Sequence, residues 1–144
     1  MRLIYLCFLA VFLLVPGGAF AQSPSDAPIA GEALPAGTLT SPEVFALFND
    51  MTVYSVTAIQ LRESVSYYDP NGEVRQLRKG IKRNGQWRVT DFGRICLQME
   101  DLPEKCRIIA REGGIYKKYI VRKSGPHQHS VSYPEFRNGN PLGL

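Results

Sequence analysis

Apolar side chains follow a helical spacing in one short segment of the chain, just before residue 50. The apolar positions are Val44, Phe45, Leu47 and Phe48. Ser41 is a suitable cap, Pro42 suits the first helical position, and Glu43 complements the helix dipole. The pattern predicts a helix of about three turns or fewer, with one apolar face, that ends near Asn49-Asp50.

The pattern changes from helical to strand-like after Met51. Short runs rich in β-branched and aromatic residues recur between turn signals such as Asp69-Pro70-Asn71-Gly72 and Gly113-Gly114. Strands are predicted near 52–56, 64–69, 73–82, 86–90, 94–99, 105–111, 115–122 and 129–134. Their spacing of about ten residues is typical of an antiparallel meander. The predicted fold class is mostly β (α+β): a short N-terminal helix packed on one end or face of a strongly curved sheet or small barrel.

Asn84-Gly85 is a candidate two-residue hairpin turn within this meander. In that register Lys82 lies opposite Trp87. Gly80 lies opposite Val89, so the indole of Trp87 would lean diagonally over the bare backbone of Gly80. This arrangement would give Gly80 a packing reason to be glycine.

The first 21 residues have the layout of a secretory signal peptide. Arg2 is followed by an unbroken apolar run over 3–15, and Ala19-Phe20-Ala21 offers a small-x-small cleavage site before Gln22. The apolar run is too short for a permanent membrane span. We therefore expect a periplasmic or secreted protein with a flexible Pro/Ala/Gly leader over 22–39, one β-rich domain over 40–136 and an irregular tail over 137–144.

Three cysteines remain to be placed once export is predicted. Cys7 lies in the signal and leaves with it, so Cys96 and Cys106 form an even pair in an oxidising compartment, for which a disulfide is the simplest interpretation. A redox-active or metal-binding pair would favour C-x-x-C or further ligands nearby. If the two cysteines lie directly opposite, Ile95 faces Arg107 and Leu97 faces Lys105. Either a bulge resets this register or the basic side chains extend past the core edge.

Several of these segments together resemble a known protein family. The residues are Gly85-Gln86-Trp87-Arg88-Val89, Gly93-Arg94-Ile95-Cys96, Cys106 and the opening Thr52-Val53-Tyr54 that follows the helix. They resemble a family of small exported proteobacterial proteins of unknown function, built from an N-terminal helix and a β-meander. The resemblance covers about residues 40–119. It implies the fold and a Gram-negative periplasmic setting, and it implies no activity and no site residues.

A dense group of cations lies in the middle of the chain. Fourteen residues without an acidic side chain contain six cations, which are Arg75, Arg78, Lys79, Lys82, Arg83 and Arg88. On neighbouring strands they would form a basic face that attracts lipid head groups, lipopolysaccharide or an acidic protein partner. The simpler interpretation is a solvated strand face that deters edge-to-edge aggregation. Nucleic acid is disfavoured, because the compartment is wrong and the stretch contains a single aromatic residue, Trp87.

His127 and His129 are the chain's two histidines, and an i, i+2 pair in an extended segment projects to one side. Such a pair can supply two ligands to zinc or copper, but a stable site needs a third, for which Glu135 is the nearest candidate. A surface pair without a metal is the simpler interpretation, and no cofactor is expected.

Two further groups of residues suggest minor hypotheses. The aromatic residues of the strands would line a cavity for an apolar or lipid ligand if the sheet closes into a barrel, although barrels of this size are more often filled by side chains. These residues are Tyr54, Tyr67, Tyr68, Tyr116, Tyr119, Tyr133 and Trp87. A carboxylate pair from Asp91, Glu100, Asp101 and Glu104 would be needed for a hydrolase, but turn formation and solubility explain these residues more simply.

The sequence therefore favours a non-enzymatic binding protein of the cell envelope. The alternative is a small carrier of an apolar or lipid ligand, and a weaker alternative is a hydrolase. No oligomeric state is predicted.

Overall fold

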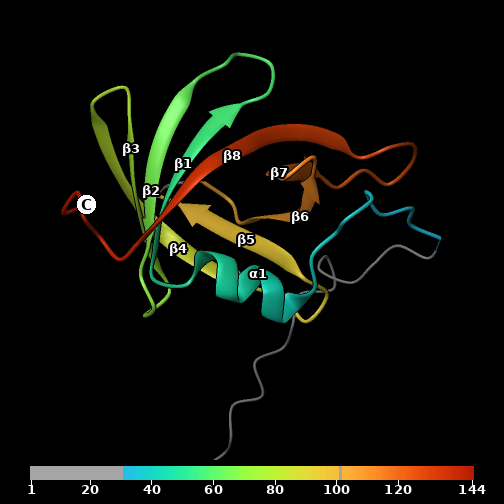
Figure 1. Ribbon diagram of the computed structural model, residues 1–144, viewed down its shortest axis with the longest axis horizontal. Helices are drawn as coiled ribbons and strands as arrows, with labels where there is room; N and C mark the ends of the chain where they lie inside the picture. The colour runs from blue at the N-terminus through green and yellow to red at the C-terminus, as the bar shows by residue number, and fades with distance from the viewer. Residues whose placement is uncertain (1–30, 101) are drawn as a thin grey trace, which may run out of the picture.

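The computed structural model describes residues 31–100 and 102–144, which form a closed eight-stranded antiparallel barrel with one helix (Figure 1). The helix is α1 (Ser41–Phe48). The strands are β1 (Met51–Thr57), β2 (Glu63–Tyr68), β3 (Glu73–Arg78), β4 (Ile81–Val89), β5 (Arg94–Met99), β6 (Lys105–Glu112), β7 (Ile115–Ile120) and β8 (Gln128–Asn138). The predicted fold class is confirmed, and of its two forms the barrel is the one that the chain adopts.

Each strand pairs with its neighbour in the sequence, and β8 pairs with β1 to close the barrel. The β1–β8 register shifts between Tyr54 and Val56, and the β7–β8 register shifts between Lys118 and Tyr119. Such irregularities increase local bend and twist, which a sheet of short strands needs in order to close.

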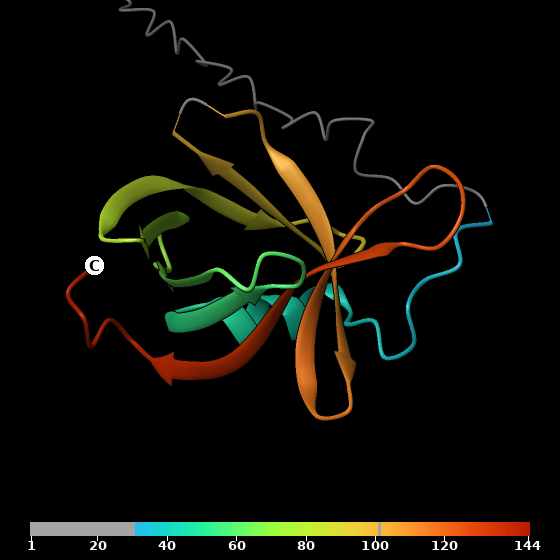
Figure 2. The same cartoon turned by 90° about the horizontal axis from the view of Figure 1, so that it is seen from above.

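The helix α1 covers one end of the barrel and lies beneath β1 and β8 when the molecule is seen from above (Figure 2). It begins one residue earlier than predicted, because Thr40 rather than Ser41 is the N-cap. The Thr40 backbone N–H and hydroxyl donate to Glu43 Oε2 at 2.8 and 2.7 Å. Val44 and Phe48 are fully buried, so the predicted apolar face is the face that closes the barrel.

The core lies at the helix end of the barrel. Phe48 makes edge-to-face contacts with Tyr68 and Tyr133, at centroid distances of 4.9 and 5.4 Å, and Tyr68 makes another with Trp87 at 5.5 Å. Val53, Val74, Ile95 and Ile109 complete this cluster. These inward-facing aromatic rings therefore pack against one another and against α1.

The predicted Asn84-Gly85 turn is wrong. Both residues lie inside β4, and the turn is formed by Lys79 and Gly80, whose φ angles of 52° and 75° suit a two-residue type I′ hairpin. Trp87 consequently pairs with Leu97 and does not lie over Gly80. Gly85 is glycine for a different reason: a Cβ there would collide with the Gln98 carbonyl group and lie 2.9 Å from the Met99 Cα.

The leader differs from its expected flexibility in the part that the structure describes. Residues 31–39 run along the outside of β6, where the Leu39 N–H donates to the Ile109 carbonyl and the Arg111 N–H donates to the Gly37 carbonyl, both at 2.9 Å. On this outer face Ile108 and Ala110 are also buried. The domain therefore begins earlier than residue 40. The predicted signal peptide and residues 22–30 lie outside the described residues.

The tail also differs in part from the irregular segment expected over 137–144. Arg137 and Asn138 belong to β8. Beyond them the Gly139 N–H donates to the Asp50 carbonyl at 2.7 Å, and Asn140 exchanges hydrogen bonds with Leu144. Across the described part of the chain, no helix has the length and apolar character needed to cross a membrane.

Candidate functional site

The six cations singled out in the sequence do not form one continuous face, because two of them are held by carboxylates. Arg75 contacts Asp69 at 3.2 Å and Glu73 at 2.9 Å, and it donates to the Leu144 carbonyl at 3.1 Å. The hydrogen bond that Arg75 donates to Glu73 raises the pKa of Arg75 above its ordinary value. Arg75 is therefore a structural cation that connects β3 to the C-terminal residue.

Arg88 is the second cation with a partner. Its Nε and Nη2 atoms donate to the two carboxylate oxygens of Glu104 at 2.8 and 2.6 Å. This bidentate pair joins β4 to the start of β6 on the outside of the barrel, beside the Cys96–Cys106 disulfide.

The other four cations lie together at the β3–β4 hairpin. We call Arg78, Lys79, Lys82 and Arg83 the hairpin cation cluster. Among the described residues, no carboxylate lies within salt-bridge distance of any of them. Lys79 and Lys82 are exposed, whereas Arg83 pairs across the strands with Gln76 on the inner face, at the mouth of the barrel. The hairpin therefore carries uncompensated positive charge at its tip.

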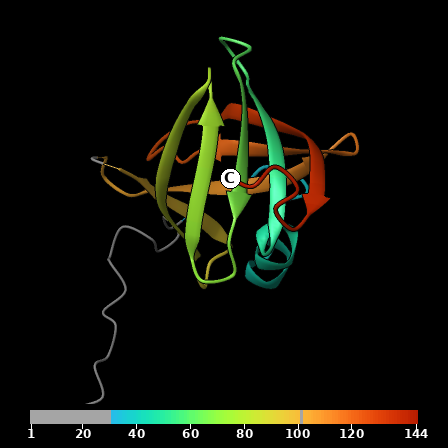
Figure 3. The same ribbon diagram turned by 90° about the vertical axis from the view of Figure 1, so that its left-hand side faces the viewer.

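This hairpin rises beside the β1–β2 connection at the end of the barrel away from α1 (Figure 3). A cleft of about 400 Å³ lies between them, lined by Val56 and Glu63 from the strand ends that the connection joins and by Lys79 and Gly80 of the hairpin. The cleft opens on the outer face of β1 to β3, over Tyr54, Val65 and Leu77. We call this end of the molecule the open end.

Three aliphatic side chains stand out from the open end. Ile59 and Leu61 in the β1–β2 connection are 78% and 73% exposed, and Ile81 in the hairpin is 63% exposed. None of the three was predicted to form a surface, because Ile59 and Leu61 fall between two predicted strands and Ile81 falls inside the predicted strand 73–82. The available signal was the presence of two large aliphatic residues in one short connection and of a third beside the basic residues of the hairpin.

The two histidines are used separately. His127 Nε2 lies 3.0 Å from Glu32 Oε1, and its Nδ1 accepts a hydrogen bond from the Arg122 backbone N–H at 3.1 Å. His129 lies 3.1 Å from the Ser132 hydroxyl, and its ring is tilted against Tyr119. The two side chains therefore have different contacts, and among the described residues neither belongs to a group of three or more candidate metal ligands.

Glu32 instead joins His127 to Arg94 in a buried charged cluster outside the barrel. Arg94 Nη2 lies 2.8 Å from Glu32 Oε2, and the three side chains are only 3–5% exposed. The Arg122 N–H occupies Nδ1 of the imidazole, and Nε2 lies close to Glu32 Oε1 without the geometry of a hydrogen bond. This cluster fixes the leader against β5 and the β7–β8 connection.

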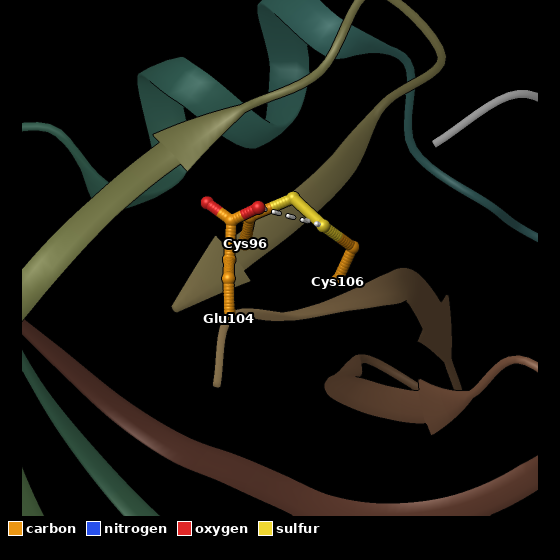
Figure 4. A group of neighbouring side chains, drawn as sticks. All are labelled: Cys96, Glu104 and Cys106. Carbon is orange, nitrogen blue, oxygen red and sulfur yellow. Dashed lines mark hydrogen bonds between the residues drawn. A yellow bond between two sulfur atoms is a disulfide. The ribbon is translucent and has the colours of Figure 1, made fainter. Parts of the chain in front are cut away.

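The disulfide is confirmed, and it answers the open question of its register. Cys96 and Cys106 are direct partners on β5 and β6, with Ile95 opposite Arg107 and Leu97 opposite Lys105. No bulge interrupts this register. Arg107 is half-buried, and the partial loss of hydration lowers its pKa. Glu104 has a ligand atom within 4.8 Å of both sulfur atoms (Figure 4), but a disulfide leaves no thiolate there for a metal.

One lysine faces the inside of the barrel. Lys118 pairs across β6 and β8 with Ile109 and Val131, both of which contribute to the core, and its Nζ lies 5.8 Å from the centre of the Tyr133 ring. Burial, assisted by the nearby Arg107, lowers the pKa of Lys118 from 10.5 to about 8. Burial raises the pKa of the Tyr133 phenol well above its ordinary value.

The aromatic residues predicted to line a cavity divide between the two faces of the barrel. Tyr68, Trp87, Tyr116 and Tyr133 pack inward at the helix end. On the outer face, the ring of Tyr54 lies 4.7 Å from the Arg137 guanidinium carbon, the Tyr67 hydroxyl donates to Asp50 at 2.8 Å, and Tyr119 donates to Glu112. Of the candidate carboxylates, Glu104 is held by Arg88 and Asp101 lies outside the described residues.

Comparisons with protein-family models, curated proteins and solved structures find no match to this chain. The resemblance to small exported proteobacterial proteins therefore stays a prediction.

Proposed function

We propose that this chain is a non-enzymatic binding protein, exported to the periplasm or secreted, that engages an anionic component of the cell envelope through the hairpin cation cluster. The observation that supports this function is the placement of Arg78, Lys79, Lys82 and Arg83 at one exposed hairpin with no carboxylate at salt-bridge distance among the described residues. The original six-residue basic face is thereby reduced to four residues, because Arg75 and Arg88 have internal partners.

The strength of such binding follows from the number of free cations. A lysine or arginine close to an anionic membrane surface contributes about 1 kcal/mol, so three or four of them give useful but reversible attraction. Exposed charges are screened over about 8 Å at physiological ionic strength. Binding through this cluster should therefore weaken steeply as salt is added.

The first prediction concerns charge reversal in the hairpin. In the variant R78E/K79E/K82E, attraction to an anionic surface becomes repulsion, and we expect at least a tenfold loss of co-sedimentation with isolated Gram-negative envelope fragments at low salt. The matched control K105E/R111E/K123E has the same change in net charge on β6 and the β7–β8 connection. It should bind within about threefold of the unmodified protein.

Circular dichroism and thermal unfolding would first establish that both variants fold. Binding by the hairpin variant equal to that of the unmodified protein at low salt would overturn the proposal. Equal losses in both variants would also overturn it, because the attraction would then depend on net charge alone.

A small-molecule carrier is the second candidate function, and the cleft of about 400 Å³ on the outer face of β1 to β3 is the observation that favours it. The barrel interior offers less support, because its aromatic rings contact one another. Native mass spectrometry of protein purified gently from its own compartment separates the two functions. A retained small-molecule adduct favours the carrier, whereas an unliganded protein favours the envelope-binding function.

A further inference from the structure

We infer that the surface bound by the open end is an anionic lipid bilayer, into whose head-group region Ile59, Leu61 and Ile81 insert. This inference rests on the proposed function and specifies its partner. We call these three side chains the aliphatic tips.

The aliphatic tips differ from the other exposed apolar residues in both exposure and placement. Their exposed fractions of 63–78% exceed those of the other exposed large apolar side chains, which are 44–53%. Those other residues are dispersed over the leader, α1, β7, the loops and the tail. A single exposed apolar side chain needs no explanation, but several at one end of a molecule mark an interaction surface.

Basic side chains accompany the aliphatic tips in the same two segments. Arg62 follows Leu61, Lys79 is the first residue of the hairpin turn, and Lys82 follows Ile81. Glu63 and Glu135 are also exposed at the cleft, but Glu135 is held by Arg137, and the four cations of the hairpin and Arg62 outnumber Glu63. Apolar side chains surrounded by cations match the chemistry of an anionic bilayer, which has negative head groups above an apolar interior. An acidic protein surface would satisfy the cations but would leave the aliphatic tips in water.

Backbone hydrogen bonds close both segments. The β1–β2 connection is closed by the Leu61 N–H, which donates to the Thr57 carbonyl at 3.0 Å, and by the Ala58 N–H, which donates to the Ser130 carbonyl at 2.9 Å. The hairpin is a two-residue turn between the paired residues Arg78 and Ile81. The open end can therefore meet a bilayer without first folding its loops, which lowers the entropic cost of binding.

The test compares two variants on vesicles of phosphatidylglycerol and of phosphatidylcholine. The variant I59S/L61S/I81S removes the aliphatic tips and keeps every charge. Its matched control, L34S/I115S/L142S, removes three aliphatic side chains that are 46–53% exposed in other segments. We expect the unmodified protein and the control to bind phosphatidylglycerol vesicles with affinities within about twofold of each other. The variant I59S/L61S/I81S should bind these vesicles at least tenfold more weakly. None of the three proteins should bind phosphatidylcholine vesicles. Circular dichroism establishes that the variants fold.

The outcomes separate this inference from the proposed function. If the variant I59S/L61S/I81S binds anionic vesicles as well as the unmodified protein, insertion is wrong and charge-driven binding stands. If the unmodified protein ignores anionic vesicles but sediments with envelope fragments through its hairpin cations, the lipid inference is wrong and the proposed function stands. If it binds neither, both are wrong. An equal loss in the control variant would also overturn insertion at the open end.

Discussion

At the scale of single residues, the most unusual position is Lys118, an amine on the inner face of the barrel. An ammonium group in a poorly hydrated site is destabilised relative to the neutral amine, and the positive charge of Arg107 adds to this effect. The residue keeps some contact with solvent, so the cost is smaller than that of complete burial. Lys118 should therefore make folding depend on pH in a range where most side chains of the chain do not titrate.

The sign of this dependence follows from the two pKa values of Lys118. In the unfolded chain it is 10.5, and in the folded protein it is about 8. Between these values the unfolded state binds the extra proton, so the contribution of Lys118 to stability rises from pH 8 to pH 10.5. Above pH 10 the tyrosines act in the opposite direction, because hydrogen bonds and burial raise the pKa values of Tyr67 and Tyr119 to about 12.

Replacement by an uncharged side chain tests this account. We expect Lys118→Met to raise the free energy of unfolding at pH 7 by about 1–2 kcal/mol, and we expect the difference from the unmodified protein to shrink by pH 10. Urea unfolding at both pH values measures it. Lys117→Met is the matched control, because Lys117 lies next in the chain but contacts Glu112 at 2.9 Å on the outer face. A constant difference across this pH range would contradict the account.

Glycine shows how far single residues can be interpreted from sequence. Asn84-Gly85 has the preferred composition of a hairpin turn, yet its two residues lie within a strand. Residue 85 is glycine because its bare backbone lies against the Gln98 carbonyl of β5. No local sequence pattern reports this contact, because Gln98 is distant in sequence. The turn is formed instead by Lys79 and Gly80, although lysine seldom adopts a positive φ and Lys-Gly is therefore a weaker turn signal than Asn-Gly.

At the scale of elements, the helix and the strands could be predicted, apart from the misplaced turn between β3 and β4, because their signals are local. A capping residue, an apolar face and the alternation of strand residues are all contained in a few consecutive positions. The leader is the exception. Its residues are mostly small, so it lacks an apolar face, and its order comes from backbone hydrogen bonds to β6 and from one carboxylate, Glu32, that reaches Arg94 and His127.

The strength of this anchoring can be measured by removing the carboxylate. In Glu32→Ala the buried side chains of Arg94 and His127 lose the carboxylate that lies between them. We expect the free energy of unfolding to fall by about 3–5 kcal/mol. The control is Glu104→Ala, which breaks a pair with Arg88 whose side chains are 34–42% exposed, and should cost about 1 kcal/mol or less. Urea unfolding measures both variants, and equal losses of unfolding free energy would contradict the expectation that the buried cluster stabilises the fold more than the exposed pair.

At the scale of the whole molecule, the two ends of the barrel differ in kind. One end is filled with aromatic side chains, and the other presents the hairpin cation cluster and the aliphatic tips. The helix α1 covers the first end, and the β3–β4 hairpin and the β1–β2 connection lie at the other (Figures 1 and 3). The cations were visible in the sequence. The sequence did not show that two of them have carboxylate partners and four do not, because partners such as Glu104 come from a distant part of the chain.

This polarity predicts an orientation on a bilayer, which the single tryptophan can report. Trp87 is 6% exposed at the helix end, so bromine-labelled phosphatidylglycerol vesicles should leave its fluorescence unchanged. In the variant Ile81→Trp we expect an added emission component that shifts to shorter wavelength and is quenched by the same vesicles. The control Ile115→Trp should show neither effect. Quenching of Trp87 in the unmodified protein would mean that the helix end faces the lipid instead.

The contact of Glu32 with Arg94 and His127 also has a consequence for where the independently folding unit starts. By secondary structure, a shortened chain that begins at Thr40 retains α1 and all eight strands. It would nevertheless lack the carboxylate that two buried side chains require, and the hydrogen bonds that Gly37 and Leu39 make with β6. We therefore expect the minimal stable fragment to begin at or before Glu32, at a boundary set by a side-chain charge and not by the first regular element.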